Sequence, residues 1–460
     1  MPNKDVTYFN GIGGISSFFI PDTGTRAAPD TKPQAAADSS RAGEHYLTAT
    51  SRSPEIRLMR IVADLHIHSR FSAACSREME VGRLAWWAKR KGITLLGTGD
   101  FTHPVYLTSL RQQLEPAEEG LFRLREGERD VRFMLTVEIT NIFRYEGRGR
   151  KTHTLIFAPS FATVDRLNRQ LAAHGNLSLD GRPTLKCTAR ELLVMAKEID
   201  PACEVIPAHV WTPWFSVLGS LSGFNSLAEC YGDDVQYIRA VETGLSSDPA
   251  MNWRLSSLDT IALISNSDAH SPRKLAREAN ILDCELHYRS VLDALTSRDP
   301  ARFLATLEFF PEEGKYHLDG HRQCQVRLSP DKTKAAQGRC PSCGKKVTVG
   351  VLHRVEALAD RDAYYVPPNA IPSQHLLPLE EIIAAAFRQR TNTKKVNVEY
   401  DRLLERYGSE LRILLDLPEE ELADGTPSRI VDGIMKVRRG EVQITPGYDG
   451  EYGKIELFSS

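Results

Sequence analysis

Short apolar runs of strand length recur through the first two-thirds of the chain, and stretches with the period of an amphipathic helix separate several of them. The predicted strands cover residues 61–68, 93–100, 132–140, 151–159, 204–210, 239–243 and a last run that closes at residue 270. The predicted helices cover residues 81–90, 164–173, 189–199 and 291–295. Because alternating strands and helices typically form a parallel sheet covered by helices, the pattern predicts an α/β fold.

Each of the seven runs carries a residue of metal-ligand type, in most cases where the run ends. His66 and His68 close the first run. Side chains two apart on a strand lie on the same side, so both imidazoles can reach one ion. Asp268 and His270 close the last run with the same spacing. The other candidates are Asp100, with His103 just beyond it, Glu138, His153, His209 and Glu242. Imidazole and carboxylate together suit Zn, Mn or Fe, and groups from several strands indicate more than one ion.

A single histidine at a strand end is more often a hydrogen-bonded core or surface residue than a metal ligand. Ten candidates near strand ends favour metal binding, because carboxylates and imidazoles rarely occupy an apolar barrel unless they are paired or bind metal. Functional groups collected where parallel strands finish favour a TIM-like barrel, here with about seven strands. Two ambiguities remain: either Asp100 or His103 can reach an ion, and Glu242 fits equally as a carboxylate that orients a ligand histidine.

The composition is that of an ordinary globular protein. The 460 residues carry a formal net charge of −2, and no apolar run approaches the length of a membrane span. The N-terminus lacks a basic region that leads into an apolar core, so we expect no signal peptide and a cytoplasmic protein. Five of the eight cysteines are expected to be reduced thiols, namely Cys75, Cys187, Cys203, Cys230 and Cys284.

The other three cysteines belong to a zinc-ribbon pattern. His321 and Cys324 are separated by two residues, and Cys340 and Cys343 follow with the same gap. Each two-residue gap lets a tight turn aim both side chains at one tetrahedral ion, so we expect one structural zinc rather than free thiols. His317 is a spare candidate for the fourth ligand. A closed four-ligand site folds a small module and performs no chemistry.

The strand pattern and the zinc-ribbon pattern divide the chain into four predicted parts. Residues 1–58, rich in Ala, Ser, Thr, Pro and Asp, are expected to form a disordered leader. Residues 59–311 contain the barrel, residues 312–362 the zinc module, and residues 363–460 a helical region. Helices are expected there at residues 379–389, 397–407 and 428–438.

The zinc module is locally basic. Residues 315–354 hold nine Lys or Arg, including Lys345 and Lys346, against two acidic residues. This excess suggests a polyanionic substrate such as nucleic acid, although a solvated loop surface would show the same charge. Arg438 and Arg439 end the last predicted helix and are further candidates for phosphate contact, but a basic last turn also complements the helix dipole.

Three large aromatic residues follow the candidate ligand His209, namely Trp211, Trp214 and Phe215. Aromatic rings beside a hydrolytic site can stack on a base that has left its helix. Packing in the core is the competing explanation. We expect at least one of the three rings to contact substrate.

The strand-end residues resemble the successive motifs of the polymerase and histidinol phosphatase (PHP) superfamily. The matching positions are residues 64–69, residues 97–100 with His103, Glu138, His153, His209 and residues 267–270. Members usually carry another histidine six residues after the His-x-His pair, a position that Ala74 occupies here. Together with residues 320–324, 340–344, 355–361 and 446–453, the pattern is similar to the endonuclease Q family over residues 60 to 458.

The resemblance implies a distorted seven-stranded barrel that holds two or three divalent ions (Zn, Mn, Mg or Fe) and hydrolyses phosphoesters. It implies a DNA-repair endonuclease that nicks 5′ to a deaminated base (uracil, hypoxanthine or xanthine) or an abasic site, and then passes the product to other repair proteins. His66, His68, Glu138 and Asp268 would share the central ions, with Glu138 bridging. His153, His209 and His270 would complete the shells, and Asp100 or His103 would hold the remaining position.

Two other functions are open on the sequence. A small-molecule phosphoesterase that acts on a phosphate monoester or nucleotide would use the same barrel metals, but it would not need the zinc module or the basic C-terminal region. A protein that binds damaged DNA without cleaving it is the other alternative, and the apparently complete ligand set argues against it.

Overall fold

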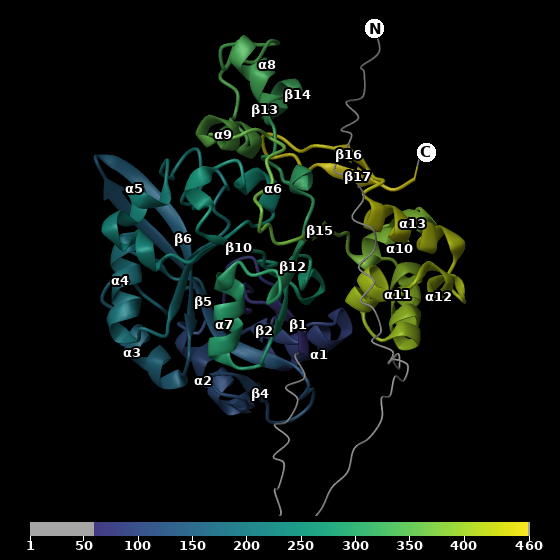
Figure 1. Cartoon of the computed structure of the whole chain (residues 1–460), viewed down its shortest axis with the longest axis horizontal. Coiled ribbons are helices and arrows are strands. Elements are labelled where there is room, and N and C mark those ends of the chain that lie inside the picture. The colour runs from purple at the N-terminus through teal and green to yellow at the C-terminus, as the bar shows by residue number, and fades with distance from the viewer. Residues whose placement is uncertain (1–58, 459–460) are drawn as a thin grey trace, which may run out of the picture. The chain divides into compact units, whose positions relative to one another are not determined.

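The central feature of the fold is an eleven-stranded mixed sheet, seen in a computed structural model that describes residues 59–458 (Figure 1). The predicted leader, residues 1–58, lies outside the described residues. The strands of this sheet are β1 (Met59–Asp64), β2 (Leu95–Gly97), β3 (Leu114–Pro116), β4 (Phe122–Leu124), β5 (Arg132–Tyr145), β6 (Arg148–Ala158), β7 (Thr184–Leu185), β8 (Glu204–Pro207), β11 (Ala279–Cys284), β12 (Phe303–Glu308) and β15 (Ser373–His375). A separate parallel pair is formed by β9 (Ala240–Glu242) and β10 (Ala262–Ile264).

The sheet combines parallel and antiparallel pairs. Parallel pairs join β1 to β2, β2 to β5 and β12 to β15. Strand β6 runs antiparallel to both β5 and β8, and β11 runs antiparallel to both β1 and β12. The α/β prediction is therefore confirmed, whereas the expectation of parallel strands was wrong for β6 and did not foresee β11 and β12.

A tight hairpin explains the direction of β6. Tyr145 pairs with Arg148, and the two residues between them, Glu146 and Gly147, both have positive φ angles of 48° and 76°. Two such residues form the turn that best matches the twist of a hairpin. The start of β6 therefore lies beside the end of β5, at the same edge of the sheet.

The helices of this part of the chain are α1 (Val81–Lys91), α2 (Pro104–Gln113), α3 (Phe161–Leu171), α4 (Ala189–Ile199), α5 (Leu227–Tyr231), α6 (Pro249–Asn252) and α7 (Tyr288–Ser297). The sequence pattern predicted α1, α3, α4 and α7, but it did not predict α2, α5 and α6. Helix α4 begins where predicted because Thr188 and Glu191 form a capping box, each side chain accepting a backbone N–H of the other residue. Helix α1 ends at Gly92, whose φ of 92° suits a left-handed C-cap.

The C-terminal third contains a small module and a helical region. The module comprises β13 (Asp319–His321), β14 (Val326–Leu328), α8 (Pro330–Ala335) and α9 (Val351–Leu358). The helical region comprises α10 (Leu379–Phe387), α11 (Lys394–Tyr407), α12 (Glu419–Ala423) and α13 (Ser428–Arg439), followed by the antiparallel pair β16 (Gln443–Thr445) and β17 (Lys454–Glu456). The predicted helices of this region are confirmed, and the turn-rich residues 446–453 connect the last two strands. Among residues 59–458, every helix is too short or too polar to cross a membrane.

Charge pairs join the helical region to the main sheet domain. Lys91, which is buried, lies 2.7 Å from Glu410, and Arg273 lies 2.8 Å from Glu380. Lys274 pairs with Glu381 at 3.0 Å. In all three pairs the cation comes from the main domain. Since Arg273 and Lys274 follow His270 closely in the sequence, the helical region is attached next to the last of the predicted ligands.

Candidate metal centre

Two clusters of ligand-type side chains share Glu138. Within each cluster, one ligand atom per residue lies within 4.8 Å of all the others. The first cluster contains His66, His68, Glu138 and Asp268, and the second contains Glu138, His153 and His209. Oε2 of Glu138 lies 3.2 Å from Nε2 of His68, and Oε1 lies 2.6 Å from Nδ1 of His153. The two oxygens of one carboxylate therefore face different clusters.

Strand pairing and the segments that follow the strands bring these residues together. The segment after β1 forms a parallel bridge between Ile67 and Ala269, which sets residues 66–68 beside residues 268–270. Thr140 of β5 pairs with His153 in the middle of β6, so His153 lies near Glu138. Gly99 passes so close to the segment after β1 that a Cβ atom would lie 2.4 Å from the carbonyl oxygen of Ile67. Only glycine allows that approach.

Three candidate residues have backbone angles that are rare for residues other than glycine. The φ angles are 47° at Asp100, 30° at His209 and 46° at Asp268. Such conformations cost about 1–3 kcal/mol each and are concentrated at functional sites. All three residues stand where a predicted strand ends, so the chain turns sharply there and aims each side chain at the site.

Several polar atoms of the first cluster are buried without a hydrogen-bond partner among the described residues. They are Nε2 of His66, Nε2 of His68 and Oδ1 of Asp268. A buried polar atom without a partner costs about 1–3 kcal/mol, so three convergent ones fit a divalent cation at this point. Burial favours neutral rings, but the nearby carboxylates hold the pKa values of His66 and His68 well above the usual range. The cluster thus attracts positive charge.

Two carboxylates outside the clusters orient these histidines. Glu242 accepts a hydrogen bond from Nδ1 of His66 at 3.0 Å, and Asp100 accepts one from Nδ1 of His68 at 3.2 Å. Both histidines consequently turn Nε2 toward the cluster, the usual arrangement around metal-binding imidazoles. Glu242 also accepts the backbone N–H of His209 at 2.9 Å. Of the two sequence interpretations of Glu242, the geometry favours the orienting carboxylate.

Three predicted ligands lie outside both clusters in the described part of the chain. The second carboxylate oxygen of Asp100 accepts hydrogen bonds from the N–H and the hydroxyl of Ser69, each at 2.6 Å. His103 is the N-cap of α2, where its Nδ1 accepts the N–H of Tyr106 at 3.4 Å. His270 stands beside the first cluster, with its ring 4.6 Å from that of His68, and remains partly exposed.

Arg182 is a candidate site residue that the sequence did not reveal. Its Nη1 donates to Oε2 of Glu138 at 3.0 Å, on the side of the first cluster. The residue lies in a loop just before β7, between Gly181 and Pro183. No strand-end pattern marks that position, and the Gly-Arg-Pro triplet indicates only a turn.

The clusters open into a pocket of about 250 Å³. Its lining includes Arg182, Trp214, Phe215, His209 and Asp268. The Phe215 ring lies 4.8 Å from that of His153, and the Trp214 side chain is 40% exposed. Of the three aromatic candidates, Trp211 lies in the core, since its ring is fully buried and its Nε1–H donates to Oδ1 of Asn252 at 2.8 Å. A buried indole whose N–H has a hydrogen-bond partner inside the protein is part of the core.

Comparison with known proteins identifies the family of the chain. A family model, the MJ0043 C-terminal domain, matches residues 378–441. The crystal structure of the lesion-specific endonuclease PfuEndoQ from Pyrococcus furiosus is 32% identical, with a TM-score of 0.77, and the match covers 86% of this chain and 95% of that chain. This chain belongs to the endonuclease Q family.

Two further relatives are similar to this endonuclease Q family member. The crystal structure of an endonuclease Q complex with a 27-mer duplex substrate, with an abasic lesion at the active site, is 31% identical, with a TM-score of 0.76. That match covers 87% of this chain and 97% of the other. The uncharacterized protein MJ0043 of Methanocaldococcus jannaschii is 32% identical over 257 residues, which are 54% of this chain. The match spans 31% of the length of MJ0043.

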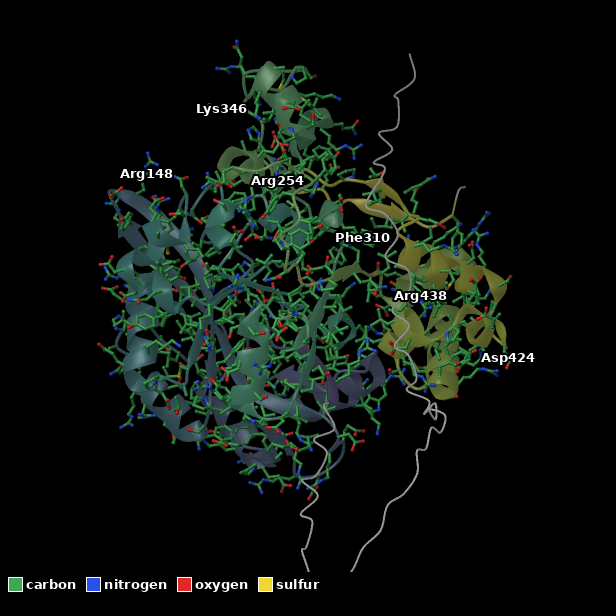
Figure 2. The ribbon with its side chains drawn as sticks, viewed as in Figure 1. Arg148, Arg254, Phe310, Lys346, Asp424 and Arg438 are labelled. Atoms are coloured by element: carbon green, nitrogen blue, oxygen red, sulfur yellow. The ribbon has the colours of Figure 1, made fainter. Side chains whose placement is uncertain are left out.

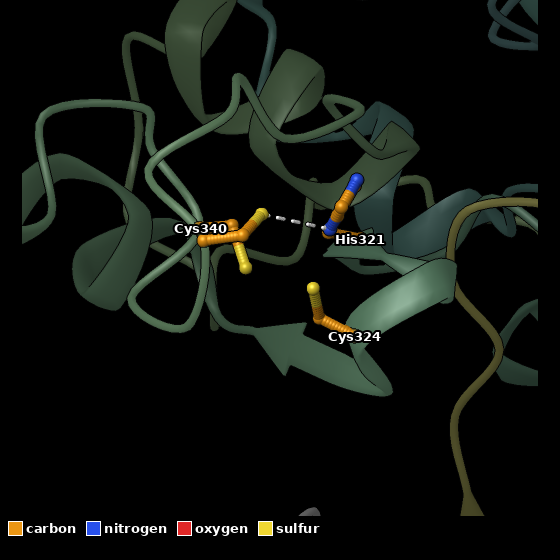
Figure 3. Close-up of side chains that lie close together, drawn as sticks. His321, Cys324 and Cys340 are labelled. Carbon is orange, nitrogen blue, oxygen red and sulfur yellow. Dashed lines mark hydrogen bonds between the residues drawn. The ribbon is translucent and has the colours of Figure 1, made fainter.

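The four residues of the zinc-ribbon pattern also lie together. Figure 3 labels three of them, His321, Cys324 and Cys340. The ligand atoms of His321, Cys324, Cys340 and Cys343 all lie within 4.8 Å of one another. Burial opposes ionisation, but N–H groups of Ser342 and Cys343 lower the pKa of the Cys340 thiol to about 7. A thiolate is the form of cysteine that binds zinc. His317, the spare candidate, is buried outside this cluster.

The basic residues predicted to contact phosphate differ in their surroundings. Lys345 and Lys346 are both exposed, and Figure 2 shows Lys346 on the module. Arg439 is exposed and pairs with Glu441 at 3.1 Å. Arg438 already has acceptors for its donors, because its guanidinium donates to the carbonyl oxygens of Ile413, Leu414 and Leu417 at 2.6–2.9 Å. These carbonyls end a helical turn, so Arg438 stabilises the helical region and has little capacity left for phosphate.

Proposed function

We propose that this chain is a metal-dependent DNA-repair endonuclease that hydrolyses the phosphodiester 5′ to a deaminated base, such as uracil, hypoxanthine or xanthine, or to an abasic site. The observation that carries the proposal is the position of Glu138 between two clusters of buried ligands that open into an aromatic pocket. The relatives add support, since one is a lesion-specific endonuclease and another holds a duplex with an abasic lesion at the active site.

The first cluster would hold one divalent ion and the second cluster another, with Glu138 bridging the two. Zn, Mn, Mg and Fe all suit this mixture of imidazole and carboxylate. When bound, a pair of ions supplies an activated water at neutral pH and stabilises the charge on the phosphate. A third ion lacks support here, because Ala74 replaces the usual histidine and His103 is occupied as the N-cap of α2.

Residues around the ions would position the DNA strand. Arg182, which donates to Glu138, can turn its remaining N–H groups toward a phosphate oxygen in the pocket. His270 at the rim would complete the shell of an ion or contact the phosphate. Trp214 and Phe215 would contact the extruded base or fill the space at an abasic site. A deaminated base costs less to extrude than a well-paired one, which would provide part of the selectivity.

The strands around the site would form the distorted seven-stranded barrel of the PHP superfamily. Strands β1, β2, β5, β6 and β8 pair in this order. After β8, the N–H of Val210 donates to the carbonyl oxygen of Glu242 at 3.0 Å. The N–H of Thr243 donates to Ile264 at 2.9 Å, and the N–H of His68 donates to Ala269 at 3.1 Å. These bonds connect β8 to β9, β9 to β10, and the run after β10 back to the run after β1, as a closed barrel requires.

The remaining parts would bind the duplex. We divide the described chain into the barrel at residues 59–311, a zinc module at residues 312–362 and a helical region from residue 363 onward. A structural zinc at His321, Cys324, Cys340 and Cys343 would hold the module together. Lys345, Lys346 and Arg439, all exposed, are the residues that we assign to the DNA backbone.

The test is a nicking assay on end-labelled duplexes that carry one uracil, hypoxanthine or abasic site, with Mg²⁺ or Mn²⁺ added. We expect a single cut 5′ to the lesion, no cut in undamaged DNA, and loss of cutting in the Asp268→Asn variant with DNA binding retained. Cutting that ignores the lesion, or turnover of a phosphate monoester without any cut in DNA, would refute the proposal.

A further inference from the structure

The loop of residues 211–224, called the aromatic loop below, forms one wall of the pocket. Thr212, Trp214 and Phe215 line the pocket from this loop. The barrel holds one side of it, because the N–H of His153 donates to the carbonyl oxygen of Phe215 at 2.9 Å. The hydroxyl of Ser222 donates to the carbonyl oxygen of Lys151 at 3.0 Å. The position of the loop therefore determines the shape of the pocket.

Arg354 of helix α9 holds the other side of the aromatic loop. Its Nε donates to the carbonyl oxygen of Leu218 at 2.9 Å, and its Nη2 donates to the carbonyl oxygen of Phe224 at 2.9 Å. Nη2 also lies 3.0 Å from Oδ1 of Asn225. The N–H of Phe224 donates to the carbonyl oxygen of Val217, so Leu218 and Phe224 stand at the two ends of one turn. A single guanidinium closes this turn.

The geometry of these bonds suits arginine in particular. A guanidinium presents N–H donors in a fixed planar fork, whereas a lysine ammonium acts as a point charge on a flexible chain. Arg354 is partly buried and makes no ion pair within 4.0 Å among residues 59–458. Its hydrogen bonds to the aromatic loop are thus the main use of its donors, rather than an incidental addition to a charge pair.

Within the zinc module, helix α9 is joined to β13, the strand that carries the predicted zinc ligand His321. The N–H of Gly350, which precedes the helix, donates to Oδ1 of Asp319 at 2.6 Å. Nδ1 of His353 lies 2.5 Å from Oδ2 of the same carboxylate. Asp319 belongs to β13, the strand that ends at the ligand His321. Gly320 and Thr348 exchange two backbone hydrogen bonds at 2.8 and 3.0 Å. Several hydrogen bonds therefore join the start of α9 to β13.

A second contact links the same module to the aromatic loop. The ring of Tyr316, three residues before β13, meets the ring of Trp214 edge-on at a centroid distance of 5.4 Å. The N–H of Val351 donates to the carbonyl oxygen of Tyr316 at 2.8 Å, so Tyr316 is also tied to the start of α9. The loop is thus contacted from the module at both its first half and its second half.

We infer that Arg354 is a positioning residue through which the zinc module holds the aromatic loop in the shape that binds the lesion. The inference rests on the proposed function for its reference to lesions, but the contact between Arg354 and the loop is independent of it. The zinc module would then serve recognition in addition to any contact with the DNA backbone. Arg354 does not touch the metal clusters, so its loss should change binding more than the chemical step.

The experiment compares Arg354→Met, Arg354→Lys and the control Arg361→Met by hydrogen–deuterium exchange and by steady-state nicking. Arg361 lies just beyond α9 and donates to Asp259 and to the carbonyl oxygen of Trp253, not to the aromatic loop. In Arg354→Met we expect amide exchange in residues 212–224 to rise about tenfold and KM for lesion DNA to rise about tenfold, with kcat within about twofold. Arg354→Lys should rescue part of both effects, and neither effect should appear in the control.

A zinc-free variant tests the connection to the module. Cys340→Ser should raise exchange in the same residues 212–224, while β5 amides exchange as in the unaltered chain. Unchanged loop exchange in Arg354→Met, or a fall in kcat and in divalent metal content with KM unchanged, would overturn the role of Arg354. Unchanged loop exchange in a zinc-free Cys340→Ser protein would overturn the link to zinc. Exchange is measured without DNA, so a chain that shows the loop effect but does not nick damaged DNA would refute only the proposed function.

Discussion

Glu242 accepts a hydrogen bond from Nδ1 of His66 at 3.0 Å, and this contact decides which nitrogen of His66 faces the metal centre. Both groups are almost completely buried. A second buried carboxylate, Asp100, has the same relation to His68. The two histidines of the His-x-His motif are therefore oriented by partners that come from different strand ends, and their Nε2 atoms converge on Glu138 and Asp268.

Replacement of Glu242 tests this orientation. In Glu242→Gln the amide presents one oxygen and one NH2 group, so it no longer offers two charged acceptors to His66 and to the N–H of His209. We expect metal affinity to fall about 10–100-fold, as found for partners of ligand histidines. Titration with Mn²⁺ measures it. The matched control is Glu204→Gln, which removes a buried carboxylate that pairs with Arg239 instead. Equal losses in both variants would show a general effect on the fold.

His103 provides a test of the ion count. Because His103 caps α2, His103→Asn should retain the cap and leave metal content and nicking within about twofold of the unaltered chain. The same change at His153, which belongs to the second cluster, should remove one ion. Metal analysis of the purified proteins compares the two. Loss of an ion from His103→Asn would mean that a third site exists.

Arg438 should matter for stability and not for DNA binding. Removal of its guanidinium in Arg438→Met leaves the carbonyls of Ile413, Leu414 and Leu417 without these donors. We expect the free energy of unfolding to fall by about 1–3 kcal/mol. The salt dependence of DNA binding should not change, whereas Lys345→Ala with Lys346→Ala should reduce its slope by about 0.9 for each phosphate that is no longer neutralised. A reduced slope in Arg438→Met would restore the phosphate interpretation.

Glu308 should make the protein less stable at higher pH. Burial raises the pKa of Glu308 to about 8, well above the value of 4.5 expected for an exposed glutamate. Between these values the unfolded chain has released the proton that the folded chain retains, so stability falls as pH rises through this window. Glu308→Gln should therefore raise the melting temperature at pH 8 and have little effect at pH 4. The same difference at both pH values would contradict the assignment.

The sequence revealed the clustered ligand-type residues more reliably than the sheet topology. His66, His68, Glu138, His153, His209 and Asp268 were found because ligand-type side chains at the ends of apolar runs are unusual. The direction of β6 was missed because it depends on a two-residue turn at Glu146 and Gly147, and the apolar period of a strand is the same in both directions.

The hydrogen-bond partners of individual side chains also could not be predicted from the sequence. Trp211 is buried and donates to Asn252, which lies 41 residues beyond it along the chain, whereas Trp214 lines the pocket, and the local sequence does not distinguish the two. Arg438 and Arg439 are neighbours with the same chemistry, yet in the described part of the chain Arg438 donates to backbone carbonyls and Arg439 pairs with Glu441. Arg182 was missed for the same reason, because its contact with Glu138 comes from a loop without a regular pattern.

The account depends most on the position of Glu138 between two ions, and anomalous diffraction from crystals soaked in Mn²⁺ measures that directly. We predict two peaks, one surrounded by His66, His68, Glu138 and Asp268 and the other by Glu138, His153 and His209, with one oxygen of Glu138 toward each. A single peak, or two peaks of which only one is bound by Glu138, would contradict the account.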